Sequence, residues 1–419
     1  MSPVSRHYVL AAGGTGGHLI PAFALAAELH QRGHHVALIT DERGAAIPGK
    51  PDYLTSHILP PGRIAGKNPL GWLKGLRGIL QGRSMALRLF DSFKPTAVVG
   101  FGGYPAMPTM LAATSAKLPI VLHEQNSVLG RVNRYFAGKV DAIATAFEEV
   151  DRLDPKHDGK VTLVGNPVRD EVLALRDQPF PEFAEDSLFR ILVTGGSQGA
   201  RVLSQVIPEG LAMLPPTLRS RLQVIQQCRP EDIDAVRQRY AVHGIPAELA
   251  TYFEDMAERL ASAHLFIGRA GASTIAELTV VGRPAILIPL PYAMDDHQSA
   301  NTREIVASGG ARVIRQPAVT TEDPERYRGD GKNALLKEQE EIFHKMAKDV
   351  CLQIQAIAKN PQTLGNAAHA AWNCGYPKAA SDLADLVESF GAAPIMDVIR
   401  MEKTAPAMGG EALAKEPAQ

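Results

Sequence analysis

Short apolar segments alternate with longer amphipathic ones along most of this chain. The apolar segments are rich in Val, Ile and Leu, and they cover residues 7–12, 35–40, 96–103, 119–125, 141–147, 189–196, 222–227, 264–271 and 284–290. Strands that are apolar almost throughout and separated by helices are typical of a parallel sheet covered on both faces. The pattern therefore predicts an α/β fold.

The order of strand, glycine turn and helix occurs at residues 7–33 and starts again at residues 189–206. Between these two units, the segment "VGNPV" at 164–168 contains a Gly and a Pro, which favour an irregular, hinge-like connection. The repeat predicts two Rossmann-like domains, residues 1–165 and residues 166–375.

The C-terminal part of the chain differs from the rest in composition and in its apolar pattern. A charged, helix-forming stretch at about 321–358 predicts a solvated helical insertion in the second domain. Residues 376–390 regain an amphipathic period and are expected to form a helix that packs back on the body of the protein. Residues 391–419 are rich in Ala, Pro, Gly, Lys and Glu, which predicts a disordered tail.

Composition narrows the class of protein. The 44 basic and 45 acidic residues balance, so no overall field favours a nucleic-acid partner. Cys228, Cys351 and Cys374 lack the spacing of a disulfide framework or a zinc site, and they fit a reducing cytosol. Because the chain has no run of about twenty apolar residues, we expect no membrane-spanning helix.

Three glycine turns are candidates for anion binding, at residues 13–17, 195–199 and 268–271. A strand that ends in glycines and opens a helix directs free backbone N–H groups and the positive end of the helix dipole toward a ligand. None of the turns has the GK[ST] ending of a P-loop, and none is a strict GxGxxG. Each turn alone is weak evidence, since glycines also permit tight packing of a strand against a helix.

The third turn is the most informative one. In "GRAGASTIAEL" the backbone of residues 272–274 would form the first helical turn, and Glu277 would lie roughly 5 to 8 Å further along the axis. That separation suits a nucleotide diphosphate at the helix end and a ribose diol beside the carboxylate. An exposed helix residue is an equally open interpretation of Glu277.

A histidine and two further segments place polar side chains after predicted strands. His18 would begin a helix, whose dipole favours a neutral imidazole that can accept a proton, although a capping role is the commoner one for a single histidine. The segment "HEQN" at 123–126 ends a strand, where open α/β sheets bind ligands. The segment "PYAMDDHQSAN" at 291–301 suits a ligand with many hydroxyl groups, and a metal site is the less favoured alternative.

Taken together, these segments resemble the MurG family of N-acetylglucosaminyltransferases of bacterial cell-wall synthesis. The resemblance rests on seven motifs in the family's order and approximate spacing: "GGTGGHLIPA", "GFGGYPAMPTMLAA", "HEQNSVLGRVNRYFA", "VGNPVRDEV", "GGSQGA", "RAGASTIAEL" and "DDHQSAN". It covers residues 8 to about 316 well and resumes weakly at 361–390. The stretch at 321–358 is longer and more charged than is usual in the family.

The resemblance implies a GT-B glycosyltransferase, in which two Rossmann-like domains with parallel sheets face a central cleft. The donor would be UDP-N-acetylglucosamine, bound mainly by the C-terminal domain. The acceptor would be the muramyl pentapeptide linked to undecaprenyl diphosphate (lipid I), bound mainly by the N-terminal domain. Transfer to its 4-hydroxyl, with inversion at the sugar, would give lipid II without a metal or other cofactor.

The matching motifs also imply residue roles. Thr15, Gly16 and Gly17 would lie near the donor sugar and diphosphate, and Asn126 and Gln298 would meet the sugar. Arg169 and Ser197 would contact UDP, with Phe253 near the uracil. The residues expected to hold diphosphate and ribose are Ala272, Ser273, Thr274, Ile275, Ala276 and Glu277. His18 is the first choice of catalytic base and Glu124 is the second.

A lipid acceptor requires a membrane-facing surface. No acidic residue occurs between Tyr53 and Phe90, whereas residues 63–88 combine six basic residues with Trp, Leu and Ile. Such a stretch is expected to bind an anionic membrane peripherally, here the cytoplasmic face of the inner membrane. A helix packed on the sheet with a solvated basic edge is the alternative, and the two can hold for different faces of one helix.

Three other functions compete with this one. Another GT-B protein, such as a diacylglycerol glycosyltransferase or a UDP-sugar 2-epimerase, would share the fold. An NAD-dependent oxidoreductase would also use two Rossmann-like units, but the chain lacks a strict GxGxxG followed by an acidic residue about 20 positions on. A non-catalytic nucleotide-sugar binding protein is the third alternative.

Overall fold

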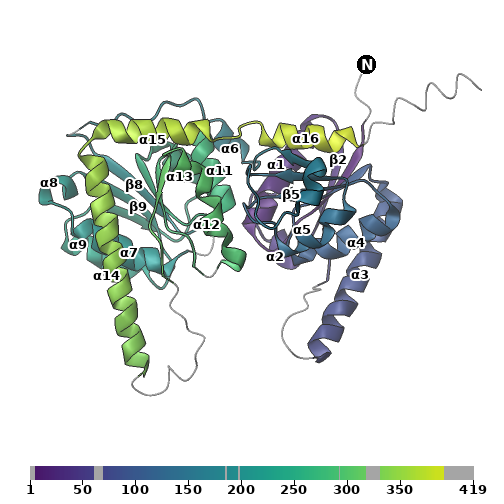
Figure 1. The fold of residues 1–419 in the computed structure, drawn as a ribbon, viewed down its shortest axis with the longest axis horizontal. Coiled ribbons are helices and arrows are strands. Elements are labelled where there is room, and N and C mark those ends of the chain that lie inside the picture. The colour runs from purple at the N-terminus through teal and green to yellow at the C-terminus, as the bar shows by residue number, and fades with distance from the viewer. Residues whose placement is uncertain are drawn as a thin grey trace, which may run out of the picture.

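The structure, a computed structural model, describes residues 5–60, 69–184, 186–196, 199–291, 293–317 and 331–390. It contains two lobes, each built on one parallel sheet, and two chain segments connect them (Figure 1). We call the lobe with strands β1–β7 the N-terminal lobe and the lobe with β8–β13 the C-terminal lobe. The α/β prediction is confirmed.

The N-terminal lobe has a seven-stranded sheet in the order β3-β2-β1-β4-β5-β6-β7. The strands are β1 (His7–Ala11), β2 (His35–Thr40), β3 (Thr55–Ile58), β4 (Ala97–Gly100), β5 (Ile120–Glu124), β6 (Ala142–Thr145) and β7 (Val161–Leu163). The inner strands β1, β4 and β5 are almost completely buried because helices cover both faces of the sheet. Those helices are α1 (Gly16–Gln31), α2 (Glu42–Ala45), α3 (Pro69–Phe93), α4 (Met107–Ala116) and α5 (Arg131–Phe136).

The C-terminal lobe has a six-stranded sheet in the order β10-β9-β8-β11-β12-β13. The strands are β8 (Phe189–Thr194), β9 (Leu222–Gln227), β10 (Ala247–Ala250), β11 (Leu265–Gly268), β12 (Ala285–Leu287) and β13 (Ala311–Val313). The helices up to the end of this sheet are α6 (Asp170–Leu173), α7 (Arg201–Ala212), α8 (Pro216–Arg219), α9 (Ile233–Val242), α10 (Met256–Ser262), α11 (Ala272–Val281), α12 (His297–Asn301) and α13 (Arg303–Ala307).

The charged region predicted as a solvated insertion forms a long helix, α14 (Gly331–Ala358), while residues 318–330 lie outside the described part of the chain. The solvated interpretation is wrong for the second half of this helix. Met346, Val350 and Ile354 are buried in the core of the C-terminal lobe, where α14 packs against α7. Many charged residues occupy the exposed side of the helix, which is why the apolar stripe was hard to recognise.

The chain crosses between the lobes twice. Residues 164–169, which include the predicted hinge, form no helix or strand and lead into the C-terminal lobe. The second crossing follows α15 (Pro361–Asn373), and α16 (Ala379–Ser389) then lies on the N-terminal lobe against α1 (Figure 1). The body on which this last helix packs is therefore the lobe at the opposite end of the sequence. Residues 391–419, predicted to be a disordered tail, lie outside the described residues.

Helix α3 carries most of the predicted membrane segment, residues 63–88, of which residues 63–68 lie outside the described part of the chain. One face of α3 is buried through Ile79, Ala86 and Phe90. Beside this face, Leu76 and Leu80 expose 47% and 54% of their surface. Within the described residues, no helix is both long and apolar enough to cross a membrane.

Candidate active site between the two lobes

A cleft of about 1160 Å³ lies between the lobes, at the ends of strands β1, β8, β11 and β12. Residues of both lobes form its walls. The cleft lies at the carboxyl ends of the strands, which is where open α/β sheets bind ligands. Ten of the residues that the sequence pointed to line this cleft: Thr15, Gly16, Gly17, Arg169, Phe253, Ala272, Ser273, Thr274, Glu277 and Gln298. Ser197 lies outside the described residues.

Arg169 and Glu277 form an ion pair in the wall of the cleft. The Nε and Nη2 atoms of Arg169 both lie 3.1 Å from Oε1 of Glu277, and Nη1 lies 2.6 Å from the Glu171 carboxylate. Burial raises the pKa of Glu277, and Arg169 offsets part of that rise. Within the described part of the chain, Oε2 of Glu277 makes no hydrogen bond, so this oxygen is available to a hydroxyl group of a ligand.

Helix α11 begins at the cleft, where its free N–H groups could bind an anion. Gly271 caps the helix with an extended backbone, and no side chain caps the first free N–H groups. The hydroxyl oxygen of Ser273 is buried and has no partner among the described residues. Buried polar groups are normally paired, so this hydroxyl indicates a place for a polar ligand.

Three arginines in the cleft wall were not identified from the sequence: Arg201, Arg229 and Arg269. Arg269 is 9% exposed and donates from Nη1 to the carbonyl oxygens of Ile288 and Pro289 at 2.9 and 3.1 Å. Burial lowers the pKa of Arg269 to about 10, which still leaves it charged at neutral pH. Arg269 lies inside the third glycine turn and Arg201 lies two residues after the second, and a basic residue at such a position is a signal that sequence analysis can use.

Two further residues of the cleft wall come from α14. Gln339 and Phe343 line the cleft, although the sequence analysis placed them in a solvated insertion. Elsewhere in the wall, Phe253 is buried beneath the guanidinium of Arg259, which lies 4.3 Å from the ring centre. Oε1 of Gln298 accepts a hydrogen bond from the Leu290 amide at 2.9 Å, so its NH₂ group is the part that can donate to a ligand.

The two candidate bases of the N-terminal lobe have different surroundings. His18 lies in the first turn of α1, is partly exposed, and has Nδ1 2.8 Å from Oε1 of Gln125. Glu124 is buried, and its carboxylate accepts hydrogen bonds from Asn126, from the Gly130 amide at 2.8 Å and from Nδ2 of Asn133 at 2.9 Å. These bonds hold the loop after β5. Glu124 therefore has the surroundings of a residue that positions this loop.

Asn126 connects the lobes. Its Oδ1 accepts a hydrogen bond from Nδ2 of Asn301 at 3.1 Å, and Oδ1 of Asn301 accepts from the Ser127 amide at 2.9 Å. Asn126 and the two candidate bases do not line the large cleft. The sequence pointed to a sugar contact at Asn126, and the structure adds a contact between lobes that no local pattern reveals.

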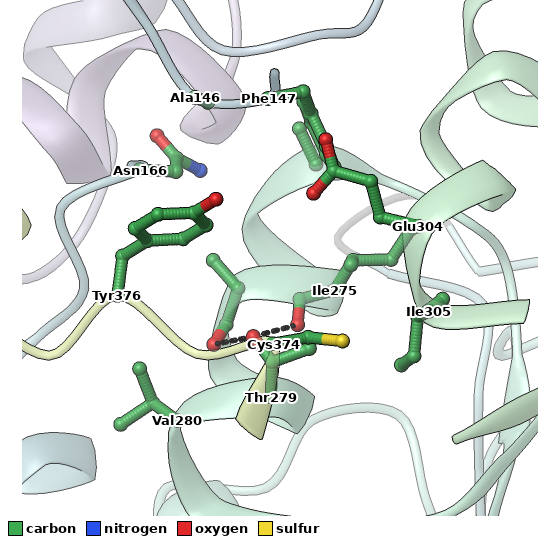
Figure 2. A pocket seen from close by; sticks show the side chains of 12 residues that line it. Ala146, Phe147, Asn166, Ile275, Thr279, Val280, Glu304, Ile305, Cys374 and Tyr376 are labelled. Carbon is green, nitrogen blue, oxygen red and sulfur yellow. Dashed lines mark hydrogen bonds between the residues drawn. The ribbon is translucent and has the colours of Figure 1, made fainter. Parts of the chain in front are cut away.

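Ile275 and Ala276 face a second, smaller pocket behind the cleft. Figure 2 shows this pocket between Asn166 of the first crossing, Tyr376 of the second crossing and Glu304 of α13. Because Ile275 and Ala276 turn toward the crossings, the ligand contacts of this helix are left to Ser273, Thr274 and Glu277. The side chain of Asn166 is buried and its amide has no partner among the described residues.

The aspartates at 295 and 296 have structural partners. Asp295 forms an ion pair with Arg152 of the other lobe at 2.7 Å, and Asp296 accepts a hydrogen bond from Ser299 at 2.8 Å. The part of the chain that the structure describes contains no group of three or more His, Cys, Asp or Glu side chains arranged to hold a metal ion. Asp295 thus contributes to the contact between the lobes.

Comparison with known families defines the class of protein. The model of the glycosyltransferase family 28 N-terminal domain matches residues 8–145, and that of the C-terminal domain matches residues 190–360. Two Rossmann-like lobes around one cleft, together with these matches, define a GT-B glycosyltransferase. A UDP-GlcNAc 2-epimerase from Neisseria meningitidis, 14% identical with a TM-score of 0.59 over 91% of this chain and 100% of its own, shares the fold alone.

Sequence relatives and solved structures identify the family within that class. The chain is 68% identical to the UDP-N-acetylglucosamine--N-acetylmuramyl-(pentapeptide) pyrophosphoryl-undecaprenol N-acetylglucosamine transferase of Novosphingobium aromaticivorans, over 98% of this chain and 99% of the relative. It is 55% identical to the enzyme of that name from Zymomonas mobilis, over 92% and 93%. The crystal structure of Acinetobacter baumannii MurG matches with a TM-score of 0.67 and 27% identity, over 92% of this chain and 99% of that chain. The chain belongs to the MurG family.

Proposed function

We propose that this chain transfers N-acetylglucosamine from UDP-N-acetylglucosamine to the muramyl sugar of undecaprenyl-diphosphate-linked pentapeptide, converting lipid I to lipid II. The observation that carries the proposal is the cleft in which the first glycine turn faces the Arg169–Glu277 pair. The full-length identity to transferases named for this reaction supports the same substrates.

The donor binds mainly against the C-terminal lobe. Oε2 of Glu277 accepts from the ribose hydroxyls, while the N–H groups at the start of α11, with Ser273 and Thr274, hold the diphosphate. Arg169, Arg201, Arg229 and Arg269 supply positive charge around the leaving diphosphate, so the residues themselves provide the stabilisation needed as charge develops. Phe253 lies toward the uracil, and Gln298 with Thr15, Gly16 and Gly17 lies toward the sugar.

The reaction is an inverting displacement. The 4-hydroxyl of the muramyl sugar attacks the anomeric carbon in line with the departing UDP, its proton passes to a base, and the bond to the diphosphate oxygen breaks. His18 is the base that the surroundings favour, because Glu124 is buried and committed to hydrogen bonds with its own loop. Glu124 instead supports the segment that carries Gln125 and Asn126.

The test is a transfer assay with radiolabelled UDP-N-acetylglucosamine and a short-chain lipid I analogue, without added metal and again with EDTA. We expect labelled disaccharide product at equal rates under both conditions. Product that disappears with EDTA would contradict the metal-independent mechanism, and UDP-sugar binding without product would contradict the acceptor.

The acceptor lipid places the enzyme peripherally on the cytoplasmic face of the inner membrane, through α3 and the residues before it. The exposed side chains of Leu76, Arg77 and Leu80 on α3 support this docking, as does the absence of acidic residues between Tyr53 and Phe90. The adjoining face of the same helix is packed in the core, so the two interpretations of this stretch apply to different faces.

Flotation with vesicles of anionic lipid tests the docking. Changing Lys74, Arg77 and Arg83 to Glu is expected to weaken binding by about 100-fold or more, because each basic residue near such a surface contributes about 1 kcal/mol. The matched control changes three exposed lysines of the C-terminal lobe, Lys345, Lys348 and Lys359, to Glu. Equal loss in the two variants would reduce the effect to overall charge and contradict a docking surface on α3.

A further inference from the structure

A chain of hydrogen bonds leads from the first crossing between the lobes to His18. The Nδ1 atom of His18 lies 2.8 Å from Oε1 of Gln125, and Nε2 of Gln125 lies 2.9 Å from Nδ1 of His123. Nε2 of His123 lies 3.0 Å from the carbonyl oxygen of Gly165. We propose that this chain fixes the proton of His18 on Nδ1, so that Nε2 is the atom that accepts the proton of the acceptor hydroxyl.

The direction of the chain is set at the Gly165 end. A backbone carbonyl oxygen can only accept, so Nε2 of His123 must carry a proton. His123 is completely buried, and burial lowers its pKa to about 4, which keeps the ring neutral at physiological pH. In a neutral imidazole with a proton on Nε2, Nδ1 is an acceptor, and Gln125 must donate to it.

A second carbonyl sets the same direction independently. Nε2 of Gln125 also lies 2.9 Å from the backbone oxygen of His123, which again can only accept. The amide of Gln125 is 1% exposed and therefore has one orientation that satisfies its neighbours, with NH₂ toward His123 and Oε1 toward His18. Because Oε1 is an acceptor, Nδ1 of His18 must donate, and the lone pair of the neutral ring is on Nε2.

Of the three side chains in the chain of hydrogen bonds, His18 is the one that is exposed in part. His123 and Gln125 are buried, whereas His18 is partly exposed at the start of α1. Gln125 and His123 thus act through His18 and are positioning residues. Partners that orient a histidine in this way are typical of sites where the ring tautomer matters.

The anchor of the chain is held by the second crossing. Gly165 has φ of +85°, and a Cβ atom at this position would lie 2.2 Å from Cβ of Tyr376. Tyr376 and the neighbouring Asn166 appear together in Figure 2. The carbonyl that orients His123 is therefore fixed where both crossings meet, and the proton position on His18 depends on contacts of the whole fold.

The first experiment is nuclear magnetic resonance of the full-length protein labelled with ¹⁵N in histidine. The pattern of couplings between ring protons and ring nitrogens reports which nitrogen carries the proton, and a His18→Gln variant assigns the His18 signals by their loss. We expect the proton on Nδ1 in the neutral form of the wild-type protein. A proton on Nε2 would overturn the proposal whether or not any variant folds.

The second experiment compares Gln125→Leu with Gln226→Leu. Gln226 is a buried glutamine of β9 that does not line the cleft, so the control makes the same chemical change at the same burial in the other lobe. In Gln125→Leu we expect kcat to fall about 10- to 100-fold, with the KM for UDP-N-acetylglucosamine within about twofold, because the donor site is intact and only the proton position is lost. The His18 spectrum of this variant should show a mixture of tautomers.

A kcat of Gln125→Leu that stays within about twofold of the control would overturn the positioning role. The inference rests on the proposed function only for the use that His18 makes of its free nitrogen. If the wild-type protein transferred no sugar, the proposed function would fail, while the tautomer measurement would still decide whether the chain of hydrogen bonds has the stated direction.

Discussion

The two lobes share one architecture but bring different chemistry to the proposed site. On the N-terminal side, His18 is connected through hydrogen bonds to Gln125 and His123. On the C-terminal side, the cleft contains arginines and the ion pair of Arg169 with Glu277. A parallel sheet with a glycine turn therefore specifies where a ligand can bind, while the residues near the turn specify the chemistry.

Physical requirements explain the division. A general base must be neutral near the working pH and must present a lone pair in a fixed direction, which hydrogen bonds with carbonyl groups can provide. A nucleotide diphosphate carries negative charge that increases as the sugar leaves, and it needs cations and helix N-termini. Substitutions in the two lobes should therefore affect different kinetic constants.

The largest expected effect follows from removal of the base. We expect His18→Ala to lower kcat by about 10²- to 10⁴-fold, the typical contribution of general base catalysis, with little change in KM for the donor. Steady-state kinetics with the lipid I analogue measures both constants. Glu124→Gln serves as the comparison, and a larger loss of kcat there than in His18→Ala would reverse the assignment of the base.

A smaller effect, on the KM for the donor, is expected from a substitution in the C-terminal lobe. Glu277→Ala should raise the KM for UDP-N-acetylglucosamine by about 10- to 100-fold, because a hydrogen bond to a charged group contributes about 1.5 to 3 kcal/mol. kcat at saturating donor should change much less. Calorimetric titration with UDP measures the binding directly. An unchanged UDP affinity would contradict the assignment of donor binding to the C-terminal lobe.

Each lobe has a buried histidine whose pKa is lowered by burial, which allows a comparison of stability. Burial lowers the pKa of both His123 and His264 to about 4. Each is protonated more readily in the unfolded chain, so stability is complete above about pH 6.5 and decreases as the pH falls toward 4. We expect His264→Gln to reduce the loss of stability between pH 7 and pH 5 by about 2 kcal/mol.

Urea unfolding of the C-terminal lobe measures this effect. Trp372 belongs to α15, and Trp72 is the other tryptophan of the chain, so a Trp72→Phe background makes the fluorescence report on the C-terminal lobe. The same pH dependence with and without His264 would show that acid destabilisation of this lobe comes from other groups.

The smallest expected effect concerns α16, which extends the N-terminal lobe with residues from the end of the sequence. Arg32 lies 2.6 Å from Glu388, and His34 also bonds Glu388. Burial alone would raise the pKa of Glu388, but these partners outweigh it and lower the pKa. Glu388→Gln should weaken the docking of α16 by about 1 kcal/mol, since the pair is partly exposed.

Hydrogen exchange of the α16 amides measures that docking, with exchange in α15 as the internal reference. Glu341→Gln, an exposed change on α14, is the matched control. Faster exchange spread equally over α15 and α16 would indicate that α16 is not a separate extension of the N-terminal lobe.

The nine strands predicted from the apolar pattern are all present, and the four missed strands, β3, β7, β10 and β13, are the edge strands of the two sheets. Helices and neighbouring strands cover an edge strand less completely than an inner strand. Accordingly, neither β3 nor β7 contains a fully buried residue. A strand of this kind lacks the continuous apolar run by which inner strands are recognised. The burial of the second half of α14 was missed for a related reason. Its apolar stripe is narrow, and the charged residues beside it hide the pattern.

The candidate site was predictable where it follows a local motif. The glycine turns, Arg169 and the residues from Ala272 to Glu277 were identified in this way, and most of them line the cleft. The hydrogen bonds of the Glu124 carboxylate, and the place of Arg229 in the cleft wall, were not visible, because they depend on which loops the fold brings together. Glu124 has the residue type of a base, and its burial among donors gives it another role.

The sequence by itself determined the alternation of strands and helices, the two-lobed class, the family and the turns that can hold an anion, since these depend on apolar periodicity and on residues close together in the chain. Only the tertiary structure decided which partners meet. Arg169 and Glu277 are 108 positions apart, His18 and Gln125 are 107 apart, and Asn126 and Asn301 are 175 apart. The physical reason is that burial and hydrogen-bond direction are properties of the packed fold, and they decide whether a histidine or a carboxylate is free to take a proton.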